Sequence, residues 1–351
     1  MSPSTDTPPH DTVKERGATS FSAVHPDILE SHILARLDGP TLASASCASS
    51  TLHSLSDEDH LWSTICRSTW PSTSAPRLHS LVSTFPGSGP RSFFANCFPL
   101  STPDPTTAAD AAASTLSPPT QEIISAVDIH YKDKLIFTKV QETETVTGWF
   151  RCSPFRIDLL DPKDVIPTPA QHPNGDDTCT ALNDDLTLSW ILIDPQCKQA
   201  MNLSSYKPVS VQRHWLSGEV QVRFGSILAG GTKACTKGLV QVGIVVTCGG
   251  SEGGEMQVRE VSLEVEDMDG MHLNGGESLV ILQRALEGQR GNGGDRVEEG
   301  RRRYGRYLEM KKERKERKMR AEGRLDMVCM VLGVSLFAAL LFFVCCRSLV
   351  K

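Results

Sequence analysis

The N-terminus lacks any run of apolar residues that could form the core of a signal peptide. Its first twenty residues, MSPSTDTPPHDTVKERGATS, are polar and contain proline. We therefore expect synthesis to begin in the cytosol and the body of the chain to stay there. Residues 1–20 are predicted to be a disordered leader, because they offer little apolar surface to bury.

The sequence also lacks paired cysteines outside its C-terminal segment. It contains 11 cysteines, but those before residue 327 stand singly and form no Cys-x-x-Cys pair, the spacing that a zinc knuckle needs. Single cysteines in a cytosolic chain are typical of reduced thiols. We therefore predict reduced, mostly buried thiols and no metal centre.

A catalytic constellation is missing as well. Residues 230–233, Gly-Gly-Thr-Lys, do not complete the frame of a phosphate-binding P-loop. Asp184 and Asp185 precede an expected strand, which favours a turn over a metal-binding or acid–base pair. No Ser or Cys has the local signature of a nucleophile. We predict a non-catalytic protein without a cofactor, and an enzyme in the middle of the chain is the least favoured alternative.

Residues 327–346 lack any formal charge. These twenty residues, MVCMVLGVSLFAALLFFVCC, include eleven Val, Leu or Phe. As a helix they would be about 30 Å long, the thickness of the hydrocarbon core of a bilayer. The eleven residues together favour insertion by roughly 5 kcal/mol. This stretch predicts a single transmembrane helix, because a buried helix of a soluble core would have polar interruptions.

The residues before this stretch carry a concentrated positive charge. Residues 301–324 contain twelve Lys or Arg and four Glu, whereas residues 1–300 contain 22 Lys or Arg and 37 Asp or Glu. Positive flanks stay on the cytosolic side, so the chain before the span is expected to face the cytosol. Because only five residues follow the span, we expect a tail anchor in the endoplasmic reticulum or the nuclear envelope.

The basic segment, residues 291–326, is predicted to be a solvated helix whose cations lie near anionic lipid headgroups. A nuclear import signal remains an alternative. Binding to nucleic acid is disfavoured, because the only aromatic residues among these cations are Tyr304 and Tyr307. The cations expected to flank the membrane are Arg301, Arg302, Arg303, Lys311, Lys312, Arg314, Lys315, Arg317, Lys318 and Arg320.

Residues 21–70 have the pattern of three short helices. In the first, apolar residues recur at helical spacing after Pro26, a residue that suits the first turn of a helix. Residues 38–40, Asp-Gly-Pro, then supply a turn, a second helix is expected over residues 42–55, and a third opens at Leu61. Three short helices make a thin core, which predicts a module that a partner completes.

This module resembles the F-box motif. The matching pattern is a proline-led helix of the form P-x-x-L-x-x-x-I-L-x-R-L, a break, a helix with apolar residues three or four apart, and an ending D-x-L-W. The resemblance implies docking on the SKP-type adaptor of a cullin-RING ubiquitin ligase. A generic three-helix domain is the alternative. The residues implied to contact the adaptor are Pro26, Leu29, Ile33, Leu34, Leu37, Leu42, Leu52, Leu55, Leu61 and Trp62.

Longer stretches resemble one family of plant F-box proteins, some of whose members carry a C-terminal membrane segment. These stretches are LDGPTLASASCASSTLHSLSDEDHLWSTICRSTWPS, PRSFF, SWILIDP and PVSVQRHWLSGEV. They fall within residues 21–290, so the resemblance includes the middle of the chain.

The middle of the chain changes from a linker to a β-rich region. Residues 71–120 are rich in Ser, Thr, Pro and Ala and predict a linker with one short helix near residues 91–98. Residues 121–290 contain nine short runs that alternate apolar and polar residues, separated by Asp, Pro and Gly. This pattern favours an antiparallel, sandwich-like β-domain over βαβ units, closed by a helix over residues 278–287.

Three tryptophans fall on separate β-runs, Trp149 at the start of the run WFRC, Trp190 and Trp215. Large aromatic side chains dominate both cores and interfaces. We expect these three in the core, and a binding face for a client or ligand is the alternative.

The chain is thus predicted to be an α+β protein with a three-helix F-box, an antiparallel β-domain and one transmembrane helix. We predict a membrane-tethered substrate receptor of an SCF-type ubiquitin ligase. The F-box would bind the adaptor and, through it, the cullin, and the β-domain would bind an unidentified client protein. Other subunits would catalyse ubiquitin transfer, while this chain positions the target. The alternative is a tail-anchored scaffold or regulator that uses the F-box only as a protein-binding module.

Overall fold

The computed structural model describes residues 24–98, 120–173, 177–230, 238–250, 253–288, 290 and 296–349. The chain divides into two compact units, Met1–Ile65 and Cys66–Lys351. The predicted leader, residues 1–20, and the part of the predicted linker at residues 99–119 lie outside the described residues.

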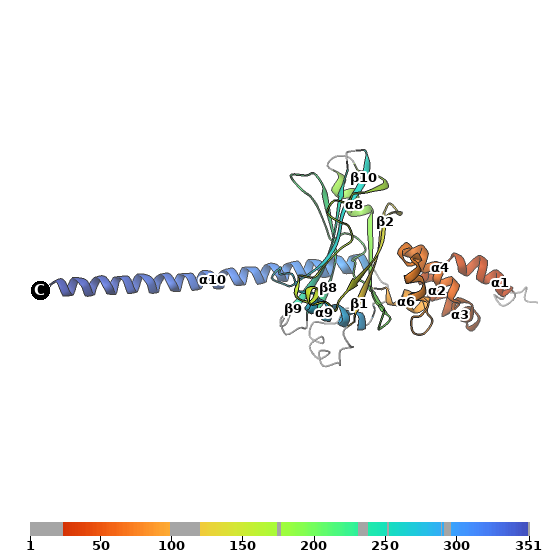
Figure 1. The fold of residues 1–351 in the computed structure, drawn as a ribbon, viewed down its shortest axis with the longest axis horizontal. Helices are drawn as coiled ribbons and strands as arrows, with labels where there is room; N and C mark the ends of the chain where they lie inside the picture. The colour runs from red at the N-terminus through yellow and green to blue at the C-terminus, as the bar shows by residue number, and fades with distance from the viewer. Residues whose placement is uncertain are drawn as a thin grey trace, which may run out of the picture. The chain divides into compact units, whose positions relative to one another are not determined.

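The first unit consists of short helical segments, drawn in red and orange in Figure 1. They are α1 (Pro26–Ile28), the π-helix η2 (Leu29–Ile33), the 3₁₀ helix η3 (Leu34–Arg36), α2 (Gly39–Ser46), α3 (Ser50–Ser56) and the start of α4 (Asp59–Thr69). Asp38 accepts a hydrogen bond from the Thr41 amide at 2.9 Å, and Ser49 accepts one from the Leu52 amide at 3.2 Å. Each of these side chains caps the start of a helix. Because Ser49 starts a new helix, α2 and α3 replace the single helix that the sequence predicts over residues 42–55.

Packed helices open the second unit. They are the end of α4, the 3₁₀ helix η4 (Pro71–Ser74), α5 (Pro76–Val82) and α6 (Pro90–Asn96). The last three each begin at a proline, whose fixed φ suits the first turn of a helix. The Phe93 ring centroid lies 6.2 Å from that of Trp70 and 5.1 Å from that of Phe85. The structure therefore has a packed helical segment over residues 66–98, where the sequence predicts a linker from residue 71.

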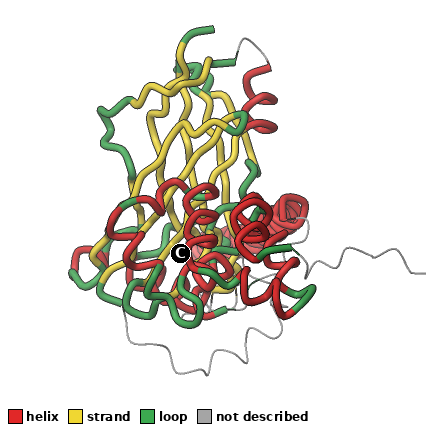
Figure 2. Tube along the Cα trace, turned by 90° about the vertical axis from the view of Figure 1, so that its right-hand side faces the viewer, coloured by secondary structure: helices red, strands yellow, loops and turns green. Residues whose placement is uncertain are grey.

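Ten strands form the β-domain in the described part of the chain. They are β1 (Glu122–Tyr131), β2 (Lys134–Glu144), β3 (Arg156–Asp158), β4 (Ile166–Gln171), β5 (Leu186–Asp194), β6 (Gln199–Asn202), β7 (Ser210–Arg213), β8 (Val220–Gly230), β9 (Gly238–Gly249) and β10 (Glu255–Glu266). One sheet has the order β2-β1-β5-β6, and the other has the order β3-β10-β9-β8-β7, with β4 also paired to β10. Figure 2 shows the strands running side by side. All of these pairings are antiparallel.

A continuous hydrophobic core joins the two sheets. It contains Trp190 of β5 in the first sheet together with Phe224 of β8 and Ile244 of β9 in the second, and these three side chains are fully buried. Val127 and Ile129, two positions apart on β1, also belong to it. Residues at every second position of a strand share a face, which is why the alternating runs indicated strands. The predicted α+β fold with antiparallel sheets is confirmed.

Parts of the β-domain differ from the prediction. The run WFRC, expected as a strand, lies in the short helix α7 (Gly148–Cys152), whose first turn is capped by the Thr147 hydroxyl. Asp184 and Asp185 end the helix α8 (Thr178–Asp185) instead of forming a turn before β5. Helix α8 and the strands β4 and β6 have no counterpart in the prediction.

Helix α9 (Gly275–Glu287) closes the domain and begins before the expected residue 278. Asn274 caps it by accepting a hydrogen bond from the Glu277 amide at 2.9 Å. Gly275 lies against the backbone of α7, where an added Cβ would stand 2.1 Å from the Phe150 carbonyl oxygen. Only glycine fits there, so α7 and α9 pack at a distance that a side chain would prevent.

Polar contacts fasten the helical segment, residues 66–98, to the four-stranded sheet. Ser72 in η4 donates hydrogen bonds to Asp128 of β1. Arg77 in α5 pairs with Glu142 of β2. The segment therefore covers β1 and β2 and belongs to the same folded unit as the β-domain.

The side chains of eight cysteines are described, and all eight are free thiols. Cys66, Cys97 and Cys248 are buried, and burial raises the pKa of Cys66 and of Cys248 to about 12. The other five of these eight are exposed or half-buried. The expectation of mostly buried thiols is therefore wrong for the described cysteines.

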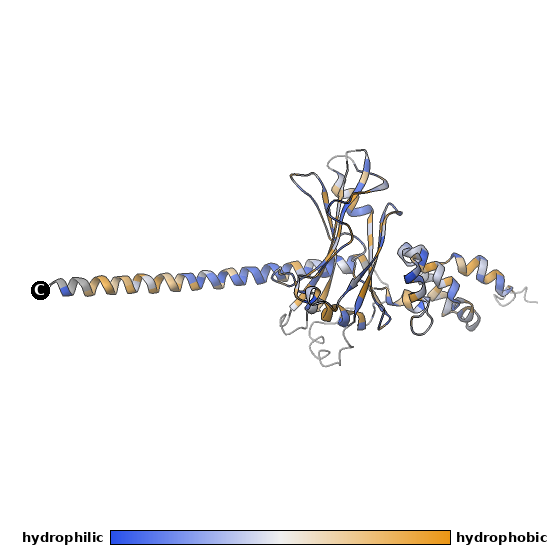
Figure 3. Ribbon diagram, viewed as in Figure 1, coloured by the Kyte–Doolittle hydropathy of each residue, from blue (hydrophilic) through white to orange (hydrophobic). Residues whose placement is uncertain are grey.

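Helix α10 (Arg296–Leu349) follows the β-domain and is 54 residues long. Figure 3 shows its hydrophilic first half in blue and its apolar second half largely in orange. Among the described residues it is the one helix long and apolar enough to cross a membrane, judged by length and composition alone. The most apolar stretch of this helix has no buried residue.

Candidate functional sites

The ten residues expected at an adaptor contact divide into a buried set and a surface set. The buried set is Leu29, Leu34, Leu42, Leu61 and Trp62, each at most 2% exposed. The Trp62 indole donates a hydrogen bond to the Ser56 carbonyl at 2.7 Å, which satisfies its one polar group. These five residues therefore hold the unit together, and an adaptor contact by the other five stays a prediction.

The surface set lies mainly on the first helical segment. Ile33 is 40% exposed and Pro26 is exposed, while Leu37, Leu52 and Leu55 are half-buried. Ile28, which the sequence reasoning omitted, is 51% exposed. Exposed branched apolar side chains on a short helical segment are suited to burial against another protein.

The π-helix η2 explains why sequence spacing did not separate these two sets. In a π-helix the hydrogen bonds reach one residue further than in an α-helix. This shift widens the spacing of inward-facing side chains, so Leu29 and Leu34, five residues apart, are both buried while Ile33 is 40% exposed. A period of 3.6 residues, applied from Pro26 onwards, does not predict that change.

The tryptophan expectation is right for Trp190 and wrong for the other two. Trp190 is 0% exposed, but Trp149 is 83% exposed and Trp215 is 87% exposed. Trp149 lies on α7, and Trp215 lies in the turn between β7 and β8 beside Leu216, which is 74% exposed. The alternative of a binding face stays a prediction for the residues of these two short segments.

The first half of α10 contacts the β-domain. Tyr304 and Tyr307 are buried, and the Tyr307 hydroxyl donates a hydrogen bond to the Asp267 carbonyl at 3.1 Å. Burial raises the pKa of Tyr304. Gly300, one turn earlier, lies close to Ser205, where an added Cβ would meet the serine Cβ at 3.7 Å.

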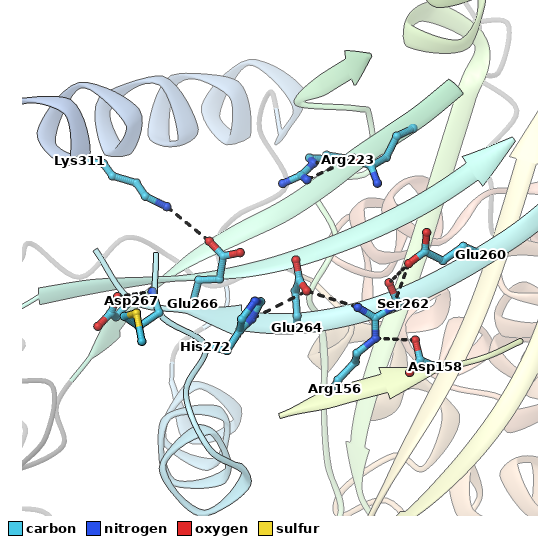
Figure 4. A network of polar contacts seen from close by, with 12 residues as sticks. Arg156, Asp158, Arg223, Glu260, Ser262, Glu264, Glu266, Asp267, His272 and Lys311 are labelled. Carbon is cyan, nitrogen blue, oxygen red and sulfur yellow. Dashed lines mark hydrogen bonds and ion pairs between the residues drawn. The ribbon is translucent and has the colours of Figure 1, made fainter. Parts of the chain in front are cut away.

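Ion pairs continue this contact towards the apolar half of the helix. The Nζ atom of Lys311 lies 3.4 Å from Oε2 of Glu266. Figure 4 draws this ion pair as a dashed line. The Arg314 guanidinium donates two hydrogen bonds of 2.9 Å to the Asp269 carboxylate, and Lys318 lies 2.9 Å from the same carboxylate. These hydrogen bonds lower the pKa of Asp269.

The ten cations expected to flank a membrane therefore have different partners. Three of them, Lys311, Arg314 and Lys318, pair with the β-domain. Four pair with glutamates of α10 itself, namely Arg302 and Arg303 with Glu299, Arg317 with Glu313, and Arg320 with Glu316. Arg301, Lys312 and Lys315 make no ion pair among the described residues. The sequence reasoning missed the contact of α10 with the β-domain, although Tyr304 and Tyr307 are aromatic residues in an otherwise charged helix.

Most of the chain is similar to proteins of Arabidopsis thaliana. It is 47% identical over 329 residues to a protein named "Probable F-box protein", and the match covers 93% of this chain and 94% of that protein. The chain belongs to the plant F-box protein family. An F-box protein of the same plant is 41% identical over 350 residues, covering 96% and 99% of the two chains, and another is 44% identical over 341 residues, covering 93% and 91%. No protein-family model and no solved structure matches this F-box protein.

One cluster in this F-box protein has the geometry to hold a metal ion. The ligand atoms of Glu264, Glu266 and His272 lie within 4.8 Å of one another. Glu264 also lies 3.8 Å from Arg156, and Glu266 pairs with Lys311 (Figure 4). Because two cations already balance the two carboxylates, we assign this cluster to the packing of β3 and α10 on β10.

Proposed function

We propose that this F-box protein is a membrane-tethered substrate receptor of an SCF-type cullin-RING ubiquitin ligase. The first unit would bind a SKP-type adaptor, and the cullin would join through that adaptor. The chain would be a non-catalytic subunit that brings a client close to ubiquitin-charged partners, which raises the rate by proximity. Family membership supports the adaptor contact, and the composition of α10 supports the tether.

The observation that carries the adaptor contact is the exposure of Ile28 and Ile33 on a proline-led helical segment. Both side chains are apolar, branched and about half exposed, so burying the exposed part against a partner releases about 0.5 to 1.5 kcal/mol each. Leu37, Leu52 and Leu55 are half-buried and would form the remainder of the contact. Leu34 and Trp62 would act indirectly by holding the helices in place.

The β-domain is proposed to bind the client. Trp215 and Leu216 stand side by side in a turn that is held by hydrogen bonds from the His214 amide to the Glu219 carbonyl at 2.7 Å and from the Gly218 amide to the His214 carbonyl at 2.9 Å. Exposed aromatic residues on an ordered turn are typical of positions that contribute most to binding energy. We therefore place the client contact at this turn.

The apolar half of α10 is proposed to cross a membrane as a single span, with the β-domain on the cytosolic side. Residues 327–346 carry no charge, and the most apolar stretch of α10 has no buried residue. Of the cations before this span, Arg320 and Arg324 stand closest to it and would meet anionic lipid headgroups. The endoplasmic reticulum and the nuclear envelope are the membranes we propose.

A pull-down tests the adaptor contact. Ile28→Asp combined with Ile33→Asp places charges in a surface that binding would desolvate, and should reduce adaptor recovery at least about tenfold. The matched control is Thr64→Asp combined with Thr69→Asp, which adds two aspartates at exposed positions of α4 that the proposed contact does not include. Undiminished adaptor recovery with the isoleucine variant would reject this contact, and failure of the unaltered chain to recover adaptor would reject the receptor function. Recovery of adaptor without cullin would favour the scaffold alternative.

A further inference from the structure

The contact of α10 with the β-domain forms a regular stripe. The residues that make it are Tyr304, Tyr307, Lys311, Arg314 and Lys318. They are spaced alternately three and four residues apart, so they lie on one face of the helix over four turns. We call these five residues the docking stripe.

The stripe has an apolar end and a charged end. At the apolar end, Tyr307 is 0% exposed and its hydroxyl is hydrogen-bonded to the β10–α9 loop. At the charged end, Arg314 and Lys318 share the Asp269 carboxylate of the same loop. The buried Tyr307 ring resists sliding of the helix along its axis. The guanidinium of Arg314, which makes two hydrogen bonds to one carboxylate, fixes the rotation of the helix about that axis. The first half of α10 is therefore held at several separated points.

The helix runs on from the docking stripe to the apolar segment. Lys318 and Met327 are nine residues apart within α10. At 1.5 Å per residue this separation is about 14 Å. Between them stands one glycine, Gly323, and no proline; an added Cβ at Gly323 would meet nothing within 4 Å. The described helix therefore continues from the β-domain into the apolar segment without a break.

We propose that α10 is a rigid strut that holds the β-domain at a fixed height above the membrane, about 14 Å measured from Lys318 to the start of the span. This inference rests on the proposed membrane insertion of residues 327–346. It assigns Lys311, Arg314 and Lys318 to the β-domain instead of the lipid. A fixed height confines the client site to one layer of cytosol beside the bilayer.

The same geometry limits which cations reach lipid. Arg301 stands about 39 Å along the helix from Met327, well beyond the screening length of about 8 Å in physiological salt. Arg320 and Arg324 stand only about 11 Å and 5 Å from Met327. The strut therefore separates the basic segment into a part that holds the β-domain and a short part that faces headgroups.

Amide hydrogen exchange on the full chain in liposomes tests the docking stripe. Tyr307→Ala with Asp269→Lys removes the buried ring and repels Arg314 and Lys318, so exchange at residues 300–318 should become at least about tenfold faster. The matched control is Leu308→Ala with Glu313→Lys, which makes the same types of change at exposed positions. Protection of β5 in both variants verifies that the β-domain remains folded. Fast exchange of residues 300–318 in the unaltered chain would overturn the proposal.

Energy transfer between the β-domain and the bilayer tests the fixed height. A donor dye is attached through an azide-bearing amino acid at Met271, which is 66% exposed, and the acceptor is a headgroup-labelled lipid. The unaltered chain should give one narrow distance distribution. Replacement of residues 320–322 by a flexible Gly-Gly-Ser tripeptide should broaden it, whereas Gly323→Ala should leave it narrow. An unaltered chain as broad as the flexible variant would overturn the strut.

These measurements separate the strut from the membrane tether on which it rests. If carbonate extracts the protein from membranes while the docking stripe is protected from hydrogen exchange, the tether and the strut are both overturned. A protein that stays in the membrane with an unprotected stripe would overturn the strut alone.

Discussion

Ser72 donates two hydrogen bonds to the buried carboxylate of Asp128, from its amide to Oδ1 at 2.9 Å and from its hydroxyl to Oδ2 at 2.5 Å. Thr138 donates a third to Oδ1 at 2.7 Å. The two partners Ser72 and Asp128 are 56 residues apart in the chain. This contact therefore joins the helical segment, residues 66–98, to β1 and β2, which lie far from it in the sequence.

Asp128→Ala should destabilise the second unit. It removes the acceptor of three hydrogen bonds and leaves the donors of Ser72 and Thr138 without a partner, at an expected cost of about 2 to 4 kcal/mol in free energy of unfolding. Urea titration of a chain ending at Arg324, followed by circular dichroism, measures the loss. Asp128→Asn is the control, because its amide oxygen still accepts and its nitrogen can donate to the Ser72 hydroxyl. Equal stability of the alanine variant would show that the contact contributes nothing.

The same carboxyl should give the unfolding free energy a pH dependence. Burial raises the pKa of Asp128 above its ordinary value of 3.8, although the hydrogen bonds oppose this effect. The folded state then binds the proton more tightly than the unfolded state, so stability falls as pH rises from 3.8 through the folded-state pKa. The difference in unfolding free energy between the unaltered chain and Asp128→Asn should therefore decrease over this window. A difference that rises with pH would contradict the assigned direction.

Arg290 should also stabilise the second unit. Its half-buried guanidinium donates hydrogen bonds to the carbonyl of Asn96 in α6 at 2.8 Å, to that of Ala200 in β6 at 2.9 Å and to that of Leu286 in α9 at 2.7 Å. Arg290→Met leaves these carbonyls without the donor and should cost about 2 to 4 kcal/mol. Arg290→Lys should restore only part of the loss, since an ammonium cannot spread its donors over the same planar fork. Full rescue by lysine, measured by the urea midpoint, would argue against the fork geometry.

Substitution by aspartate should have different effects at two neighbouring residues of the first unit, Ile33 and Leu34. Leu34 is 2% exposed, so Leu34→Asp places a charge in the core and should unfold the unit. Ile33 is 40% exposed, so Ile33→Asp should leave the fold intact and reduce only adaptor binding. Circular dichroism of each variant, together with the pull-down, separates the two effects. Loss of folded structure in Ile33→Asp would place this side chain in the core.

Charges in the apolar segment should release the chain from membranes. Leu336→Arg with Leu340→Arg adds about 5 to 7 kcal/mol to the cost of insertion, more than the roughly 5 kcal/mol that favours it. Carbonate extraction should then find the variant in the supernatant, as it should a chain that ends at Arg324. Leu336→Phe with Leu340→Phe keeps the segment apolar and should remain in the pellet. A pelleted arginine variant would show that the chain is held by another segment.

Most of the strands that the sequence predicted correctly are long enough to show alternation, although the short strands β3 and β7 were predicted as well. In β8 and β10, 11 and 12 residues long, the apolar positions repeat often enough to identify the strand. The run WFRC offers only four residues, and the Thr147 cap outweighs their strand preference. Strand β4 contains Pro167 and Pro169, residues that argue against a strand, and was missed for that reason.

The candidate sites could be predicted as motifs but not as surfaces. The proline-led pattern located the F-box, but the change of helix type at η2 decides that Ile33 is exposed and Leu34 is buried. In the same way, the charges of the basic segment were evident, but their partners Glu266 and Asp269 come from another part of the chain. Sequence spacing does not reveal contacts between distant segments, which depend on the tertiary fold.

The prolines of β4 have a consequence for how copies of this chain behave when crowded together. A strand at the edge of a sheet can recruit a strand from a neighbouring molecule, which leads to aggregation. Proline has no N–H group, so at two of its six positions β4 offers no donor to such a strand. The margin of the sheet formed by β3 and β4 is therefore a poor template for stacking, and should help to keep densely packed copies apart.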